Sequence, residues 1–275
     1  MKKFLRIFSF AAIFALLFHA AVFAASVDWN DGSITAEGIG VFPALDNPGQ
    51  ARAMARRAAI VDAYRNLGEY VESVRVTSET TVRNSMVEND IVKTKMSAII
   101  KEAVIVAEEP DGRGNYLVVL KMPIYGKGSL ASAVLQQPAT VKPFPPPTVS
   151  EPSPPPAIGK PAKGSYGRGY TGLVIDCRGL DLSPVMSPVI YDENRRPIYG
   201  YDNLDYQKVI DIGMADYEKG DGNFRRSGDN PLIVKAIALD GHGGNPVISE
   251  ADANYILAEN TKTHFLDNLA VVFIS

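Results

Sequence analysis

The stretch that decides the fold of the first half of the chain is residues 51–67, ARAMARRAAIVDAYRNL. Its apolar residues recur with helical spacing and continue one turn further, as Ile60, Ala63, Tyr64, Leu67 and Val71. A helix start precedes it: Asn47 is a good N-cap, Pro48 suits the first helical position, and Gln50 has capping-box spacing. We therefore predict a helix that packs on a sheet.

Three arginines on this helix, Arg52, Arg56 and Arg57, have two interpretations. The favoured one is a row of solvated side chains beside the packing face. The alternative is an anion-binding or partner-binding site, but no glycine-rich phosphate loop accompanies them.

Periodicity predicts the elements around this helix. Alternating or apolar runs predict four strands, at residues 34–41, 73–83, 104–108 and 116–122. A second amphipathic helix carries Val92, Met96, Ile99 and Ala103, and the segment PDGRGN (110–115) predicts a hairpin turn. The expected order is β-α-β-α-β-β, an α+β domain with two helices on one face of a mostly antiparallel sheet.

Residues 138–161 contain ten prolines. Proline lacks an amide hydrogen and fixes φ, so this run favours an extended, semi-rigid spacer. A proline-rich ligand for an aromatic groove is the alternative. We place a linker at residues 136–165, between a first domain at 27–135 and a second domain at 166–275.

The second domain is predicted to be α+β as well. Strands are expected at 172–177, 232–239 and 269–274, and a hairpin joins 188–191 to 197–199. Ser249, followed by acidic residues, marks the start of a helix.

The N-terminus has the pattern of a secretory signal peptide, residues 1–24. A positive start precedes an apolar run, and Val22 and Ala24 suit the cleavage site; a retained anchor is the alternative. Cleavage removes three positive charges, which moves the formal net charge from −3 to −6. An acidic chain argues against nonspecific nucleic-acid binding. We expect a periplasmic or secreted protein, with peripheral outer-membrane association left open.

Residues with catalytic or metal-binding chemistry are sparse. The lone thiol, Cys177, lies in an apolar strand and is expected to be buried and inert. His242 lies in a turn and His264 late in a helix, without metal-ligand spacing. Two Gly-rich acidic loops, 216–223 and 240–245, are explained by turns, with calcium as the minor alternative. We assign no catalytic residue, cofactor or metal.

The segments ITAEGIGV (34–41), ARAMARRAAIVDAYRNLGEYV (51–71) and VRVTSETTV (74–82) carry a family resemblance. The first domain resembles the LPP-twenty family of bacterial surface lipoproteins and is similar to the N-terminal region of flagellar assembly protein T. Gly38 and Gly40 belong to the shared pattern. The resemblance implies an exported, non-enzymatic α+β module of the cell envelope. Lipoprotein members have a cysteine at the cleavage site, which residues 21–28 lack.

The expected function is assembly or scaffolding in the envelope through protein–protein contacts, with envelope or flagellar-base proteins as partners. A module that binds cell-wall glycan is the first alternative, with Tyr191, Tyr199, Tyr201 and Tyr206 as a source of aromatic surface. A hydrolase with an unrecognised pair of acids is the second. The oligomeric state is not predicted.

Overall fold

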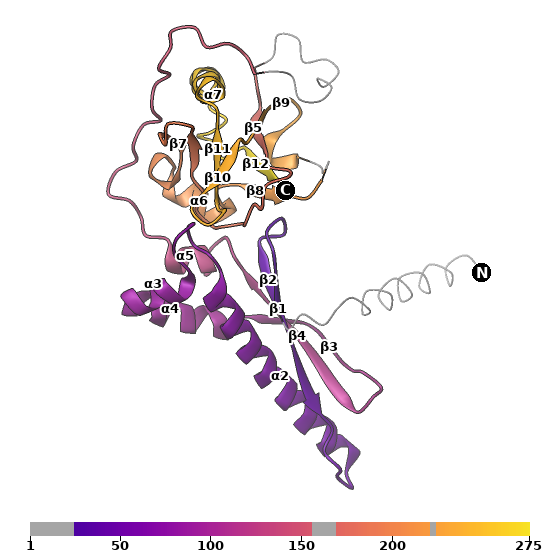
Figure 1. The fold of residues 1–275 in the computed structure, drawn as a ribbon. Coiled ribbons are helices and arrows are strands. Elements are labelled where there is room, and N and C mark those ends of the chain that lie inside the picture. Colours follow the sequence, from indigo (N-terminus) through magenta and orange to yellow (C-terminus); the bar gives the residue numbers. More distant parts are fainter. Residues whose placement is uncertain (1–24, 156–168, 221–223) are drawn as a thin grey trace, which may run out of the picture.

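The computed structural model describes residues 25–155, 169–220 and 224–275. The predicted signal peptide, 1–24, and the end of the proline segment lie outside the described residues. No helix in the described ranges is both long enough and apolar enough to span a membrane. The fold is α+β in two domains, as predicted (Figure 1).

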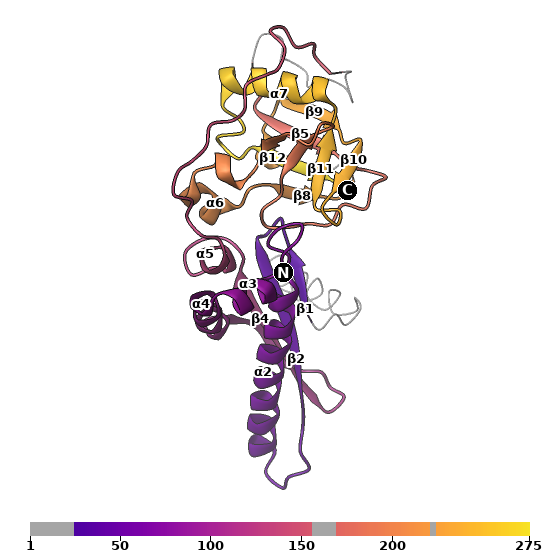
Figure 2. The same cartoon turned by 60° about the vertical axis from the view of Figure 1, so that its left-hand side comes forward.

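The first domain is a four-stranded antiparallel sheet with helices on one face (Figures 1 and 2). The sheet order is β1-β2-β4-β3. The strands are β1 (Ala25–Asp28), β2 (Ser33–Val41), β3 (Val104–Pro110) and β4 (Asn115–Pro123). The helices are α2 (Pro48–Ser73), α3 (Val82–Glu88), α4 (Asp90–Lys101) and α5 (Leu130–Val134).

Helix α2 begins as predicted. The Asn47 side chain is the N-cap and accepts hydrogen bonds from the backbone amides of Gly49 (2.9 Å) and Gln50 (3.2 Å). The buried side of α2 is lined with small residues every four positions, followed by two larger ones; its members are Ala51, Ala55, Ala59, Ala63, Leu67 and Val71. The predicted stripe is correct at its C-terminal end, whereas Ile60 and Tyr64 are only half-buried.

The alanine stripe lets α2 lie very close to β2. A Cβ atom placed on Gly38 would be 2.1 Å from the Ala63 amide nitrogen, and one on Gly40 would be 1.9 Å from the Ala55 carbonyl oxygen. Real Cβ atoms essentially never approach within 3.0 Å, so the strand needs glycine at both positions.

The predicted strand at 73–83 is wrong. Helix α2 runs through Ser73, and the following residues form a tight turn closed by an isolated bridge between Arg75 and Thr81. The backbone carbonyls of Arg75 and Val76 instead accept hydrogen bonds from Met186 (3.0 Å) and Ser187 (2.8 Å) of the second domain. The alternation therefore reflects burial against the other domain. The observed order is β1-β2-α2-α3-α4-β3-β4-α5 in place of the predicted β-α-β-α-β-β.

Two further first-domain predictions are confirmed, although Ala103, placed in the second helix, lies beyond the end of α4. The second amphipathic helix is α4, with Val92, Met96 and Ile99 buried. The segment PDGRGN joins β3 to β4 as a hairpin, and Asp111 closes the turn by accepting from the amides of Arg113 and Asn115.

The second domain contains two four-stranded sheets. One is fully parallel, in the order β8-β12-β5-β9, and the other is mixed, in the order β10-β11-β6-β7. The strands are β5 (Gly172–Asp176), β6 (Ile190–Asp192), β7 (Pro197–Tyr199), β8 (Asp216–Glu218), β9 (Pro231–Lys235), β10 (Ala238–Asp240), β11 (Asn245–Ile248) and β12 (Val271–Ile274). The helices are α6 (Tyr206–Ile212) and α7 (Glu250–Thr263), with short 3-10 turns at Tyr201–Asn203 and Arg225–Ser227.

Most second-domain predictions hold. The hairpin of β6 and β7, the N-cap at Ser249 and the terminal strand are present. The single strand expected at 232–239 is instead divided into β9 and β10, which belong to different sheets. His264 is the C-cap of α7 in a left-handed conformation.

The described part of the linker, residues 136–155, is extended as expected, but it lies against the second domain. Phe144 stacks on Tyr199, with ring centroids 6.4 Å apart. Arg196 Nη1 donates to the Pro146 carbonyl oxygen (3.1 Å), and the Thr148 amide donates to Asn254 Oδ1 (2.8 Å). These contacts make this part of the segment a strap along the second domain.

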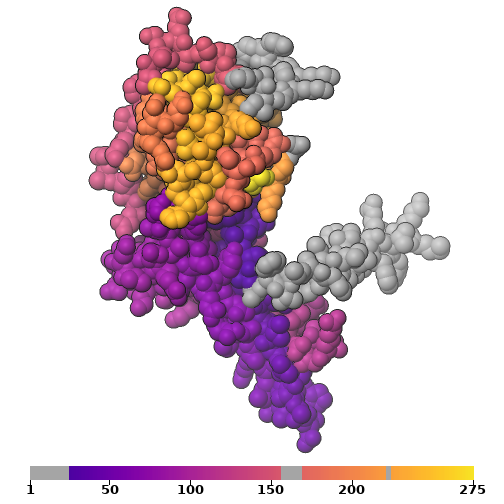
Figure 3. All heavy atoms as spheres, in the orientation of Figure 1, coloured from indigo at the N-terminus to yellow at the C-terminus, as the bar shows by residue number. Residues whose placement is uncertain are grey.

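The two domains share one continuous hydrophobic cluster. Backbone hydrogen bonds join them, among them Gly126 N–H to the Ile210 carbonyl oxygen (2.7 Å). Asn245 Nδ2 also donates to Ser78 Oγ (2.8 Å) in a buried contact. The space-filling view shows the second domain as a lobe from which the first domain extends as an arm (Figure 3).

Candidate functional site: a cleft between the two domains

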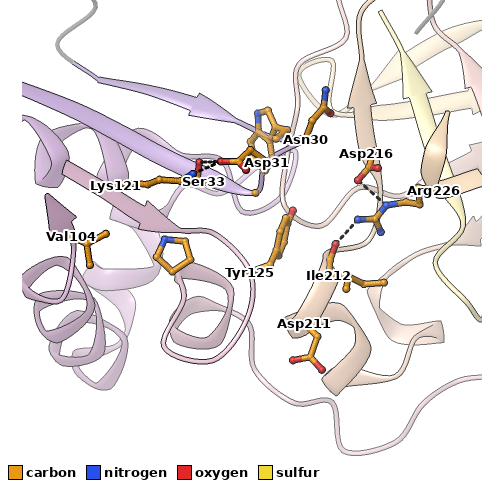
Figure 4. A pocket seen from close by; sticks show the side chains of 13 residues that line it. Asn30, Asp31, Ser33, Val104, Lys121, Tyr125, Asp211, Ile212, Asp216 and Arg226 are labelled. Atoms are coloured by element: carbon orange, nitrogen blue, oxygen red, sulfur yellow. Dashed lines mark hydrogen bonds and ion pairs between the residues drawn. The ribbon is translucent and has the colours of Figure 1, made fainter. Parts of the chain in front are cut away.

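A cleft of about 430 Å³ lies where the two domains meet (Figure 4). Its volume is in the range of small-molecule sites, which often lie at domain interfaces. The first domain contributes the turn between β1 and β2, the start of β3 and the end of β4. The second domain contributes the end of α6, β8 and the 3-10 turn at Arg225–Ser227.

The first-domain wall is built on a tight turn. The Asp28 carboxylate accepts hydrogen bonds from the amides of Asn30 and Asp31, each at 3.0 Å. This turn directs Asp31 toward the sheet, where its carboxylate accepts from Lys121 Nζ (2.5 Å) and Ser33 Oγ (2.7 Å). Both hydrogen bonds stabilise the carboxylate and lower the pKa of Asp31 below its usual value.

The second-domain wall is organised by Arg226. Its Nε donates to Asp216 Oδ1 (2.7 Å), and its Nη atoms donate to the carbonyl oxygens of Ile212, Gly213 (3.0 Å) and Leu269 (3.3 Å). Burial nevertheless raises the pKa of Asp216 above its usual value, with Arg226 opposing this only in part.

The hydrolase alternative requires two acids that face one reacting bond. Asp31 and Asp216 line the same cleft and have pKa values shifted in opposite directions. Each carboxylate, however, points toward its own cation, on opposite sides of the cleft (Figure 4). This is the arrangement of two wall-stabilising ion pairs, and it does not place two carboxylates on one bond.

Tyr125 joins the two walls. Its ring packs between two glycines of positive φ, Gly32 of the first domain and Gly213 of the second. A Cβ on Gly213 would be 2.4 Å from Tyr125 Cζ, and one on Gly32 would be 3.3 Å from Cδ2. The ring is therefore clamped, while the hydroxyl points into the cleft (Figure 4).

The helix arginines do not converge. Arg56 Nε is 2.7 Å from Glu108 Oε2, the Arg52 guanidinium lies over the Tyr116 ring at 5.5 Å from its centroid, and Arg57 is exposed. Two of the three thus have partners within the first domain, which agrees with the packing interpretation of this helix.

The predicted burial of Cys177 is confirmed. Cys177 is buried, and burial raises the pKa of its thiol to about 12. His242 and His264 lie in separate places and each contacts a single carboxylate, Glu79 (3.2 Å) and Asp267 (3.5 Å).

Each of the two acidic loops holds an arginine through one carboxylate. Asp216 binds Arg226, and Asp240 binds Arg195. Residues 221–223 of the first loop lie outside the described residues. Across the ranges that the structure describes, no three His, Cys, Asp or Glu side chains are grouped to hold a metal ion.

The predicted tyrosine surface is dispersed. Tyr199 is fully buried and donates to the Met214 carbonyl oxygen (2.6 Å), and Tyr206 is half-buried in α6. Tyr191 and Tyr201 line a second cavity of about 470 Å³ between the strap and the β6–β7 hairpin. The aromatic residues of the interdomain cleft, Trp29 and Tyr125, were missed, because isolated residues in two separate turns carry no motif.

Residues 172–275 match a protein family described as Treponema pallidum Tp0624, second domain. The match begins at β5 and covers less than half of the chain. No curated protein matches this chain. The likeness therefore concerns the second domain, and it leaves the first domain to be interpreted from its own residues.

Proposed function

We propose that the chain is an exported, non-enzymatic protein of the bacterial cell envelope that acts in assembly or scaffolding through contacts with other proteins. Its partners are envelope proteins or proteins of the flagellar base, and its location is periplasmic, secreted or peripheral at the outer membrane. The observation that carries this proposal is the exposed apolar surface of the first domain.

That surface is concentrated on one domain. Of the fourteen large apolar side chains exposed in the described residues, ten lie before the linker. Monomeric proteins rarely leave extensive apolar surface uncovered, and such surface commonly marks a protein contact. The first domain is therefore the part expected to bind a partner.

Half of these ten residues lie on the sheet, on the face opposite α2 and on the edge. Ile39 and Val41 of β2 point away from α2, and Ile39 pairs in register with Leu117 of β4. Edge strand β3 adds Val104, Ile105 and Val106, each at least 39% exposed. An apolar edge strand favours pairing with another chain. We call Ile39, Val41, Val104, Ile105 and Val106 the arm surface.

The rest of the structure supports a scaffolding role. The domains share a hydrophobic core and backbone hydrogen bonds, so the arm is held in a fixed orientation to the second domain. A rigid connection of this kind is useful in a protein that positions two partners relative to each other. The proposed location in the cell envelope is supported by the signal-peptide pattern and by the family resemblance of the first domain.

The test is fractionation of cells that express the full chain with a C-terminal tag, combined with mass determination of the mature N-terminus. We expect recovery from the periplasmic or outer-membrane fraction with an N-terminus at or near Ala25. Recovery of the uncleaved chain in the cytoplasm would contradict the proposal.

A further inference from the structure

The hydroxyl of Tyr125 is the unexplained group in the interdomain cleft. Two buried tyrosines of the second domain use theirs: Tyr199 donates to the Met214 carbonyl oxygen and Tyr217 to that of Val185 (2.8 Å). The Tyr125 side chain is half-buried, and its hydroxyl has no such partner among the described residues, although its ring is fixed between two glycines. A positioned hydroxyl that faces a cavity is ready to bond a ligand.

The charges in the cleft argue against an anionic ligand. Lys121 is bonded to Asp31, and the donors of Arg226 are directed to Asp216 and to backbone carbonyls. Asp211, also in the lining, has only Gln207 as a side-chain partner (2.9 Å). The lining thus carries three carboxylates and two cations, and each cation is already paired with one of these carboxylates.

The remaining groups suit a neutral ligand with hydroxyls. Tyr125 supplies a hydroxyl that donates and accepts. Asn30 supplies an amide oxygen as acceptor, because its Nδ2 donates to Glu218 Oε2 (3.3 Å). Trp29 adds an aromatic surface, held in place by Tyr217 at a centroid distance of 5.6 Å. A sugar ring offers the matching combination, because it has an apolar C–H face and hydroxyls around its edge.

We propose that the interdomain cleft binds a neutral saccharide, with the sugar ring against Trp29 and one sugar hydroxyl hydrogen-bonded to Tyr125 Oη. The cleft shares Val104 with the arm surface, but Trp29 and Tyr125 lie outside that surface. The saccharide proposal therefore does not depend on which protein partner the arm binds. The saccharide is either a unit of a wall glycan or a free sugar, because both present the same chemistry.

Trp29 makes the proposal directly measurable, because it is the only tryptophan in the sequence. The full mature chain is titrated with glucose, maltotetraose, N-acetylglucosamine tetramer and muramidase-solubilised wall glycan, while tryptophan fluorescence is recorded. Glucuronate and glucosamine serve as the anionic and cationic comparisons. Preference for the free sugars or for the wall fragments distinguishes the two sources.

Two matched variants test whether the fluorescence change arises from binding in the interdomain cleft. Tyr125→Phe keeps the clamped ring and removes only the hydroxyl, so it should fold normally and bind about five- to tenfold more weakly. Tyr191→Phe removes a hydroxyl from the lining of the second cavity and should bind like the wild type. Thermal melting of each variant confirms its fold.

A saturable change with a neutral saccharide that weakens in Tyr125→Phe and persists in Tyr191→Phe supports the proposal. It is overturned if no neutral saccharide produces a saturable change, if only the charged sugars do, or if Tyr125→Phe binds like the wild type.

Discussion

Replacing Gly38 with alanine should strongly destabilise the first domain. The added Cβ would lie 2.1 Å from the Ala63 amide nitrogen and 2.2 Å from the Ala59 carbonyl oxygen, where ordinary contact begins at 3.4 Å. Both neighbours are backbone atoms of α2, so no side-chain rotation relieves the clash. The helix must instead move away from the sheet by about 1 Å, which loosens the packing along the alanine stripe.

The size of the effect follows from overpacking. Added methyl groups in a tight core cost about 1–3 kcal/mol. Because the contacts here are with rigid backbone, we expect the upper end, a loss of about 3 kcal/mol in the free energy of unfolding. For a chain of this length that corresponds to a fall in Tm of about 6–12 °C. Urea and thermal denaturation followed by circular dichroism at 222 nm measure both quantities.

Gly68→Ala is the matched control. Gly68 lies inside α2, and a Cβ there would meet no atom within 4 Å. Alanine is the better helix former, so this variant should be more stable by about 0.5–1 kcal/mol. Both substitutions replace glycine with alanine, but the expected changes in the free energy of unfolding have opposite signs. If Gly38→Ala unfolds within about 0.5 kcal/mol of the wild type, the close packing of α2 on β2 is refuted.

Three further substitutions or reactions test other parts of the structure. Tyr199→Phe should lower the free energy of unfolding by about 1–2 kcal/mol in urea denaturation, because it leaves the buried Met214 carbonyl oxygen without its 2.6 Å donor; an unchanged midpoint would contradict this. Cys177, with a pKa of about 12, should react with Ellman's reagent at pH 8 on the order of 1,000-fold more slowly in the folded chain than in urea, because the thiolate fraction falls by that factor; equal rates would show that it is accessible. Arg178 lowers the pKa of Asp176 below 3.8, so the ion pair stabilises the folded chain above that pH and ceases to do so as the pH falls below it. Asp176→Asn should therefore lose most stability at pH 7, and its difference from the wild type should shrink as the pH falls below 3.8 and through the lowered pKa, whereas a loss that is equal at every pH would argue against the pair.

Helix starts and turns were predicted correctly from the sequence, because they depend on the chemistry of a few neighbouring residues. Asn47 before Pro48 marks a helix start because a side-chain acceptor next to free amides works in any context. The turn at Asp111 and the N-cap at Ser249 are correct for the same reason. The α+β class follows from such signals, because they fix the order of most strands and helices.

The strand predicted at residues 73–83 is absent because these residues pack against parts of the chain that are distant in sequence. The alternation of Val74 and Val76 is real, and both side chains are buried. Part of their surroundings, however, comes from the second domain, which lies more than a hundred residues further along the chain. An alternating pattern indicates which side chains are buried. It does not show whether a neighbouring strand is present, or which one it is.

The cleft was not predictable for a similar reason. It combines the turn at Trp29, the end of β4 and residues near Arg226, which become neighbours only when the domains dock. The one local trace is glycine at positions 32 and 213, and glycine is common in turns that line no cleft.

The most direct test of the scaffolding role is site-specific photocrosslinking in intact cells, with the probe at Val41 on the arm surface or at Ile237 on the second domain. The two side chains are similarly exposed, 69% and 53%, so they differ mainly in location. The account predicts a discrete adduct with an envelope or flagellar-base protein from position 41 that is absent from position 237. The absence of any adduct from position 41, or the same adducts from both positions, would contradict it.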